Sequence, residues 1–284
     1  MHVHQPDVRF CRLFSVKINF IMKKYLAVFR VNWQKSFEYR ADFFGHMGIG
    51  IISFLVMYFI WSAIFKERET FNGYTFSSMM TYVLLTRFLH FVQRGNIGRM
   101  VANEIKEGQL SSYLLKPVSY IKWWLSIFLA DRFFESFVRF TMLISLFILL
   151  PEIVIFSGTG KFILFLFFLL FSLMINFIIN ILVASLAFWI TDVRLFRSTI
   201  MIIIDFFAGA LVPLDVMPGV LKKIGYLLPF KFTAFFPIKL YQGTISSSEI
   251  YFGILEAGAW IAAMFLILAV IWKRGLKNYE AVGQ

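Results

Sequence analysis

The chain has 284 residues, of which 60% are hydrophobic and only 15% are charged, and its formal net charge is +12. One core could not bury so many apolar side chains, so this composition excludes an ordinary soluble domain and favours a membrane protein. The basic residues are spread over loops between apolar segments and do not form one basic face, so no nucleic-acid partner is expected. The single cysteine excludes an intramolecular disulfide, and the four histidines lack metal-ligand spacing.

The N-terminal region divides into two parts. Residues 1–21 have no long apolar core and no small-residue cleavage site, so they do not resemble a secretory signal. Met22 is a more natural start, and we expect residues 1–21 to be an extension without function and residues 22–284 to form a single transmembrane domain. Residues 23–42 are predicted to form an interfacial helix, because four aromatic residues spaced by four give one apolar stripe with a basic flank: Tyr25, Phe29, Trp33 and Phe37. A soluble helix packed on a neighbour is the alternative.

Six apolar segments follow, each judged against the roughly 20 residues that cross a bilayer core. They lie near residues 43–65, 74–93, 126–150, 162–190, 197–214 and 252–272. An even number of spans returns both ends of the chain to one side. The two termini and the loops on their side hold 18 lysines and arginines, whereas the opposite loops hold 7. The positive-inside rule therefore predicts cytoplasmic termini in a multi-pass protein of the cell membrane, such as a bacterial inner membrane.

The longest polar interruption in the first half of the chain runs from Arg94 to Lys122. It lies on the predicted cytoplasmic side. A break at Gly108 precedes three leucines, and Pro117 ends the following segment because it lacks an N–H and has a fixed φ. The pattern predicts a short amphipathic helix at the membrane edge, exposed to the cytosol.

The third span carries four charged residues at helical spacing: Asp131, Arg132, Glu135 and Arg139. Glu135 could pair with Arg132 or Arg139 on one helix face. Such charges are tolerable only where they face protein or the cytoplasmic interface. A structural ion-pair network and a functional role both remain open.

Spans four and five contain isolated polar residues. Asn176 and Asn180 share one helix face, where they could join two helices or line a cavity. Asp205 lies in an apolar run, and a carboxylate at the centre of a membrane helix costs about 2.5–3.5 kcal/mol. We therefore expect Asp205 to face a partner or an aqueous cavity, and its role is open between structure and function.

Span five is followed by an apolar, aromatic segment that four prolines divide: Pro213, Pro218, Pro229 and Pro237. The pieces are too short to span a bilayer. We expect one or two short re-entrant helices that dip into the outer leaflet before span six.

The sequence offers no phosphate-binding loop. Gly160 and Lys161 suggest one, but Ile155 and Phe162 occupy the places that require glycine and a hydroxyl residue. Nucleophile-elbow and HExxH motifs are also absent from the sequence. We therefore expect this chain to bind no cofactor and to have no catalytic residues of its own.

Three segments carry a family resemblance. They are Glu104–Pro117 (EIKEGQLSSYLLKP), the proline-rich return after span five, and the ending Arg274–Glu280 (RGLKNYE). With them the sequence resembles the permease subunits of ABC exporters of the second type, in particular the antibiotic-efflux-like branch. The resemblance covers most of the chain from Met22.

The resemblance implies an all-α integral membrane fold with an N-terminal elbow helix, six transmembrane helices and an outer lid of short helices. It also implies that the loop between spans two and three forms a cytoplasmic coupling helix that docks on a separate ATPase. In this chain the matching residues are Glu104, Glu107, Gly108, Gln109, Leu110, Tyr113, Leu114, Lys116 and Pro117. ATP and Mg²⁺ would then be bound by the ATP-binding ABC subunit, and a second permease, identical or related, would complete the pathway in the lipid bilayer.

Two other function classes stay open from the residues alone. An integral membrane enzyme acting on lipids would need cytoplasm-facing carboxylates, of which Asp131 and Glu135 could be the first. An ion-coupled carrier could use Asp205 for protons, although no internal repeat is found. The aromatic, lightly polar composition suits an amphipathic or hydrophobic cargo such as a drug, lipid or peptide, but phenylalanines facing lipid give the same composition.

Overall fold

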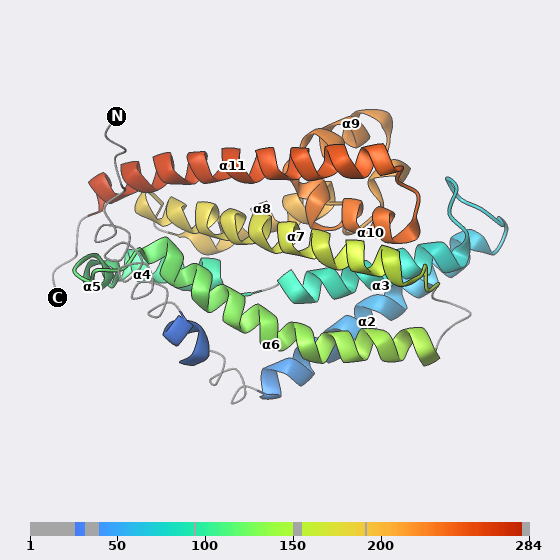
Figure 1. The fold of residues 1–284 in the computed structure, drawn as a ribbon, viewed down its shortest axis with the longest axis horizontal. Helices are drawn as coiled ribbons and strands as arrows, with labels where there is room; N and C mark the ends of the chain where they lie inside the picture. Colours follow the sequence, from blue (N-terminus) through green and yellow to red (C-terminus); the bar gives the residue numbers. More distant parts are fainter. Residues whose placement is uncertain (1–25, 32–39, 94, 150–154, 191, 280–284) are drawn as a thin grey trace, which may run out of the picture.

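The computed structural model describes residues 26–31, 40–93, 95–149, 155–190 and 192–279, which form an elongated helical bundle (Figure 1). The principal helices are α2 (Arg40–Phe65), α3 (Phe76–Gln93), α6 (Tyr120–Leu149), α7 (Thr159–Ser185), α8 (Val193–Phe207) and α11 (Ser247–Asn278). The shorter helices are α4 (Ile97–Lys106), α5 (Leu110–Leu114), α9 (Gly219–Leu227) and α10 (Phe235–Gln242), with 3-10 turns η1 (Leu186–Phe188), η2 (Leu214–Val216) and η3 (Pro229–Thr233). No β-strand occurs in these described ranges, so the all-α prediction is confirmed.

Parts of the N-terminal prediction lie outside the described residues. These include residues 1–21 and most of the expected interfacial helix, of which residues 26–31 are helical. The side chains of Glu135 and Arg139 in α6 are also outside the description, and with them the predicted charge pairs of that helix.

Each of the six predicted spans falls on a principal helix. Among the described residues, Thr159–Phe188 and Ser247–Asn278 are long and apolar enough to cross a membrane. The predicted span 197–214 was wrong at its end, because α8 stops at Phe207. The chain then turns at Gly209, whose φ of 77° is a left-handed conformation that favours glycine. With 15 residues α8 is about 22 Å long, shorter than a hydrocarbon core of about 30 Å.

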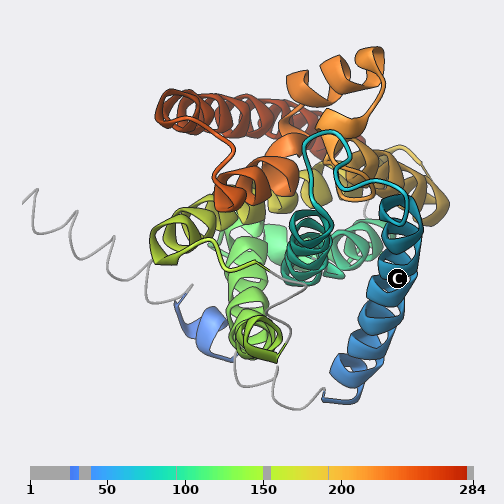
Figure 2. The same cartoon turned by 90° about the vertical axis from the view of Figure 1, so that its right-hand side faces the viewer.

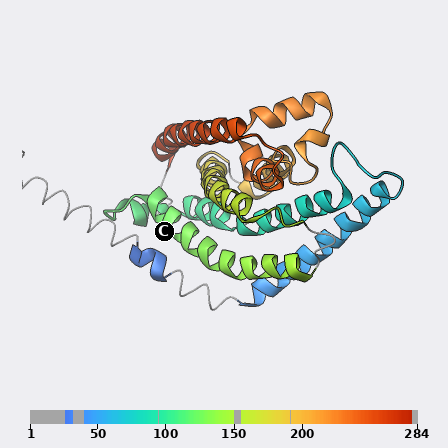
Figure 3. The ribbon, with the colours of Figure 1, turned by 45° about the vertical axis from the view of Figure 1, so that its right-hand side comes forward.

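Helix α7 contacts α4, α10, α11 and η3, and its second half lies inside the bundle, whereas its first half exposes Ile163, Phe167 and Leu170. A helix that is apolar on every face is stable where other helices surround it, and the sequence of α7 has this composition. Its fully buried side chains include Phe165, Phe168, Ile175, Phe177, Ile178 and Ile181. The remaining helices are therefore arranged around α7, with α2 and α11 on opposite sides of the bundle (Figures 2 and 3).

The connecting segments gather at two opposite ends of the bundle. Helices α4 and α5 and the end of α11 lie at one end, and the loop 66–75, α9 and α10 lie at the other (Figure 1). Hydrogen bonds tie each end together: the Ser111 N–H donates to the Tyr279 hydroxyl, and the Tyr241 hydroxyl donates to the Ile155 carbonyl. This distribution matches the predicted alternation of loops between two sides.

The proline-rich return consists of short pieces, as expected. Pro218 precedes α9 and Pro229 begins η3, whereas Pro237 lies in the first turn of α10 and does not break it. A proline at such a position is tolerated because the first turn of a helix has free N–H groups. Helix α11 starts five residues before the predicted span six, because Ser246 and Glu249 form a capping box.

Candidate functional site

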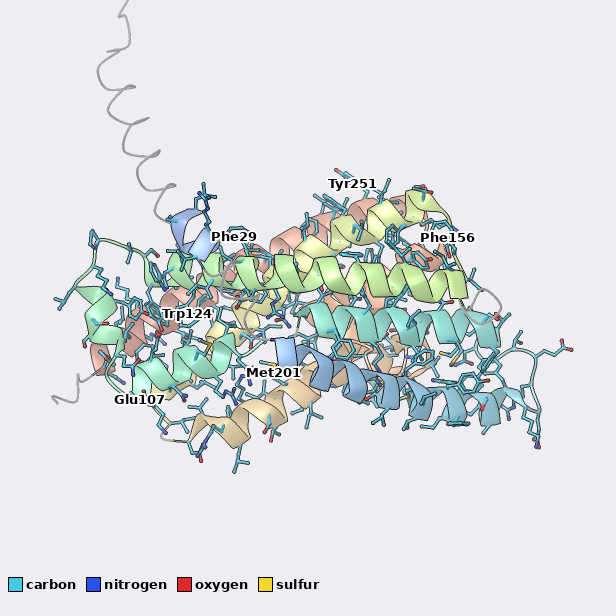
Figure 4. All side chains as sticks on the ribbon, turned by 90° about the horizontal axis from the view of Figure 1, so that it is seen from below. Phe29, Glu107, Trp124, Phe156, Met201 and Tyr251 are labelled. Atoms are coloured by element: carbon cyan, nitrogen blue, oxygen red, sulfur yellow. The ribbon has the colours of Figure 1, made fainter. Side chains whose placement is uncertain are left out.

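The candidate site is built on the α4–α5 unit, residues 97–114, at one end of the bundle. Helix α4 is amphipathic: Ile97, Val101 and Ile105 recur at four-residue spacing and are buried, whereas Asn103 and Lys106 are exposed. The apolar stripe holds the unit on the bundle, and its polar face is left at the surface. Figure 4 shows Glu107 and Trp124 at this end, and Phe156 and Tyr251 toward the other.

Close packing joins α4 to α7 at Gly98. A Cβ atom there would lie 2.9 Å from Asn180 Oδ1 and 3.1 Å from the Asn180 carbonyl oxygen, so only glycine permits this approach. Asn180 Oδ1 also accepts a hydrogen bond from Arg197 Nη2 of α8 at 3.1 Å. The Asn180 amide nitrogen donates to the Asn176 carbonyl at 2.9 Å. Asn180 therefore connects α7 with α8, and the α4–α5 unit rests against this connection.

The α4–α5 unit turns at Gly108, whose φ of 75° ends α4 just before α5 begins. Leu110, the first residue of α5, is fully buried. The Ser111 N–H donates to the Tyr279 hydroxyl at 3.2 Å, so α5 is also attached to the segment that follows α11. Leu110 was expected to face a partner, but its side chain packs inside this chain.

Glu104 joins the α4–α5 unit to the start of α6. Its carboxylate accepts hydrogen bonds from the Tyr120 hydroxyl at 2.5 Å, the Trp124 indole N–H at 3.2 Å and the Tyr113 hydroxyl at 3.4 Å. Burial raises the pKa of the Tyr113 and Tyr120 hydroxyls, and the neighbouring Glu104 carboxylate raises it further. Tyr120 also stacks on Trp272 of α11 with ring centroids 5.2 Å apart. The sequence reading placed Glu104 among the docking residues and missed Tyr120, Trp124 and Trp272.

The outward face of the α4–α5 unit and its exit is mixed in character. Leu114 is 50% exposed and Leu115 is 88% exposed. Around them lie exposed polar and proline residues: Glu107, Gln109, Lys116 and Pro117. Two local contacts order this face, since Gln109 Nε2 donates to Glu107 at 2.8 Å and Lys116 Nζ lies 4.8 Å from the centre of the Tyr113 ring. Two adjacent exposed leucines within a polar rim are typical of a protein contact surface.

Asp205 of α8 has a partner on another helix. Its carboxylate lies 3.4 Å from His90 Nε2 of α3, and both side chains are partly exposed. Asp205 can therefore join α3 to α8 and still be reached from outside this chain. The sequence offered no signal that His90 was the partner.

Two further polar contacts, one buried and one partly buried, were also missed by sequence reasoning. Gln93 at the end of α3 donates to Ser172 Oγ of α7 and to the Thr233 carbonyl of η3, both at 2.7 Å. At the opposite end, Asp215 pairs with Lys239 at 3.0 Å and accepts a hydrogen bond from the Tyr74 hydroxyl. These contacts fix the short helices of the proline-rich return to α3 and α7.

The third span brings one of its charges inside. Arg132 is buried, and its Nη1 donates to the Val92 carbonyl at 3.4 Å while the guanidinium lies over the Phe128 ring. Among the described residues, no group of three or more His, Cys, Asp or Glu side chains could hold a metal ion.

These features define the class of the protein: an all-helical membrane protein with long apolar helices and a polar helical unit at one end. A family model described as ABC-2 family transporter protein matches residues 51–283, so the chain belongs to that family. The chain is thus a membrane permease subunit of an ABC transporter, and the family implies an ABC ATP-binding subunit as its partner. Comparison with curated proteins gives no match.

Proposed function

We propose that this chain is the permease of an ATP-driven exporter and receives the movement of its ATPase through the exposed face of the α4–α5 unit. The observation that carries the proposal is the division of this unit into two halves. Its buried half is attached to α6, α7 and the segment after α11, whereas its exposed half presents Leu114 and Leu115 within a polar rim. ATP and Mg²⁺ belong to the ATPase in this proposal.

The attachments suggest how a movement at the surface would travel. A push on α5 passes through the turn at Gly108 to α4, where Glu104 holds Tyr120 and Trp124 at the start of α6. Tyr120 stacks on Trp272, so α11 moves with α6. Because packed helices move as rigid bodies more easily than they deform, the stroke of the ATPase would tilt these helices together.

In the membrane, the proposal places all six principal helices across the bilayer, with the α4–α5 end and both termini in the cytoplasm of a bacterial cell. The short α8 would reach across together with the turn that follows it. The return through Pro213, Pro218, Pro229 and Pro237 would form the outer lid. Two permeases, identical or related, would enclose the pathway.

Within this pathway we propose that Asp205 and His90 contact the cargo. Asp205 and His90 are partly exposed on α8 and α3, so a second permease chain could complete a cavity around them. For Asn176 and Asn180 we propose the role of joining helices and not that of lining a cavity, since Asn180 of α7 accepts a hydrogen bond from Arg197 of α8. A cargo with an apolar body and a polar group fits these surroundings best.

Two surface variants test the docking. Glu107→Lys reverses a charge at the rim, and Leu114→Asp places a carboxylate where an apolar side chain would be desolvated. Leu114→Asp should cost about 2 kcal/mol or more, a loss of roughly thirtyfold in affinity for the ATPase. Glu107→Lys should weaken the binding because it changes the charge complementarity of the surface. The measurement is capture of the co-expressed ATPase at several concentrations by the permease in detergent.

Matched controls come from exposed residues at the other end of the bundle. Glu69→Lys makes the same charge change in the loop before α3, and Leu227→Asp makes the same apolar-to-acid change at the end of α9, where Leu227 is exposed. Both controls should bind the ATPase like the original protein, and all four variants should insert normally. Undiminished capture by both Glu107→Lys and Leu114→Asp would refute docking at this face.

A further inference from the structure

A groove of about 820 Å³ lies between α4 and the first turn of α8. Its lining is Arg99, Met100, Ala102, Asn103, Lys106, Glu107, Val193, Arg194 and Arg197. Four of these residues are cationic and one is anionic, so the groove has a strong excess of positive charge. The groove shares Glu107 with the proposed coupling face, but the exposed leucines of that face, Leu114 and Leu115, do not line it.

The cations in the groove differ in how firmly they are held. Arg197 is fixed at the base, since its Nη2 donates to Asn180 Oδ1 at 3.1 Å and to the Gly95 carbonyl at 3.4 Å. Arg99, Lys106 and Arg194 are exposed, and Arg194 Nε lies 3.6 Å from the exposed Asp192 carboxylate. The only acid that lines the groove, Glu107, accepts a hydrogen bond from Gln109 at 2.8 Å. A fixed guanidinium beside exposed cations is suited to the oxygens of a phosphate group.

The surroundings of the groove indicate the source of that phosphate. Helix α8 leads from the groove into the apolar body of the protein, and its outer side exposes Leu195, Phe196, Ile202 and Ile203. At helical spacing Arg194 therefore borders an apolar face that acyl chains can cover, whereas Arg197 lies on the side of α8 that contacts α4 and α7. Cations at such a boundary meet lipid headgroups, whereas a soluble phosphate would have no use for the apolar face.

We propose that the groove between α4 and α8 binds the phosphate headgroup of an anionic lipid, whose acyl chains lie along the exposed face of α8. The lipid would fill the space beside the α4–α5 unit. The position of this unit would then depend on how much anionic lipid the cytoplasmic leaflet contains. This site lies beside the proposed ATPase contact and shares only Glu107 with it.

Native mass spectrometry of the full chain in neutral detergent, titrated with phosphatidylglycerol or phosphatidylcholine, tests the proposal. The double variant Arg99→Gln/Arg194→Gln removes two exposed cations and leaves the anchored Arg197 in place. A basic residue near an anionic membrane surface contributes about fivefold in affinity, so the double variant should bind phosphatidylglycerol roughly thirtyfold more weakly. Its binding of phosphatidylcholine should not change.

Lys222→Gln/Lys223→Gln in α9 is the matched control, with the same change in charge far from the groove, and should bind phosphatidylglycerol within about threefold of the original protein. An equal loss in this control, or no loss in the Arg99/Arg194 variant, would overturn the site. If millimolar inorganic phosphate displaces bound phosphatidylglycerol as effectively as added unbound phosphatidylglycerol does, the ligand is a soluble phosphate and the lipid assignment fails. If the Arg99/Arg194 variant loses the ATPase but retains the lipid, the groove belongs to the ATPase contact, whereas the Leu114→Asp variant tests the coupling separately.

Discussion

Glu104→Ala should detach the α4–α5 unit from the start of α6. The substitution removes the acceptor of two buried donors, the Tyr120 hydroxyl and the Trp124 indole N–H, whose residues are 6% and 2% exposed. A buried donor left without a partner costs about 1–3 kcal/mol. For two such donors the free energy of local opening should therefore fall by about 2–6 kcal/mol.

Three further variants grade the effect. Glu104→Gln keeps an oxygen acceptor and should cost about 1–2 kcal/mol, because the bonds lose their charge. Tyr120→Phe removes the donor together with its hydrogen bond, so no buried group is left unsatisfied, and its cost should be similar to that of Glu104→Gln. Tyr113→Phe removes a contact of 3.4 Å, which is long for a hydroxyl donor, and should be nearly neutral.

Hydrogen exchange of residues 97–122 in the full-length protein measures the opening directly. Protection from exchange should be lowest in Glu104→Ala and intermediate in Glu104→Gln and Tyr120→Phe. In Tyr113→Phe it should be close to that of the original protein. In transport assays with the ATPase present, Glu104→Ala should still capture the ATPase but move less cargo for each ATP hydrolysed. If exchange in Glu104→Ala matches that in Tyr113→Phe, the carboxylate does not hold the unit, and the route from α5 to α6 has to be abandoned.

Three other outcomes are expected. Accessibility tags at Gln284 and in the loop 94–122 should both be cytoplasmic and a tag near Ser247 should be outside, whereas opposite sides for the first two would contradict the six-span topology. Asp205→Asn should leave insertion intact but change transport or cargo-stimulated ATP hydrolysis, and unchanged transport over a range of cargo concentrations would leave Asp205 a structural role only. The raised pKa of Tyr113 and Tyr120 means that the folded protein holds both protons more tightly than the unfolded chain. The stability that these two hydroxyls contribute should therefore be complete below pH 10.0 and be lost as the pH rises through their raised pKa. Absorbance titration combined with tryptophan fluorescence follows this loss, and titration of both hydroxyls at their ordinary pKa without change in fluorescence would contradict it.

The sequence predicted the features that depend on local chemistry. Gly108 ends α4, α5 occupies Leu110–Leu114, and prolines divide the return after α8 into short helices. These elements follow from backbone rules that act within a few residues, so one sequence is enough to find them. The ends of α8 and α11 were placed less well, because apolar composition does not show where a cap or a left-handed residue stops a helix.

Partners across the fold could not be predicted. Glu104 looked like a surface acid because its neighbours in sequence are polar, yet its hydrogen-bond donors come from residues 9, 16 and 20 positions away. His90 and Asp205 are separated by more than a hundred residues and meet only when α3 packs beside α8. An amphipathic pattern shows that one side of a helix is apolar, but it does not tell whether that side meets lipid, the same chain or another protein.

Leu110 and Leu114 show why this distinction matters for coupling. They lie four residues apart in one short helix and looked equivalent in the sequence, but Leu110 is fully buried and Leu114 is half exposed. A surface that only binds a partner could tolerate a loose base. A surface that transmits force needs one residue of the pair fixed inside its own chain, because otherwise the movement would be absorbed where α5 meets the bundle. The burial of Leu110 therefore supports force transmission through α5. The exposure of Leu114 supports contact with the ATPase, which capture of the ATPase by the Leu114→Asp variant tests.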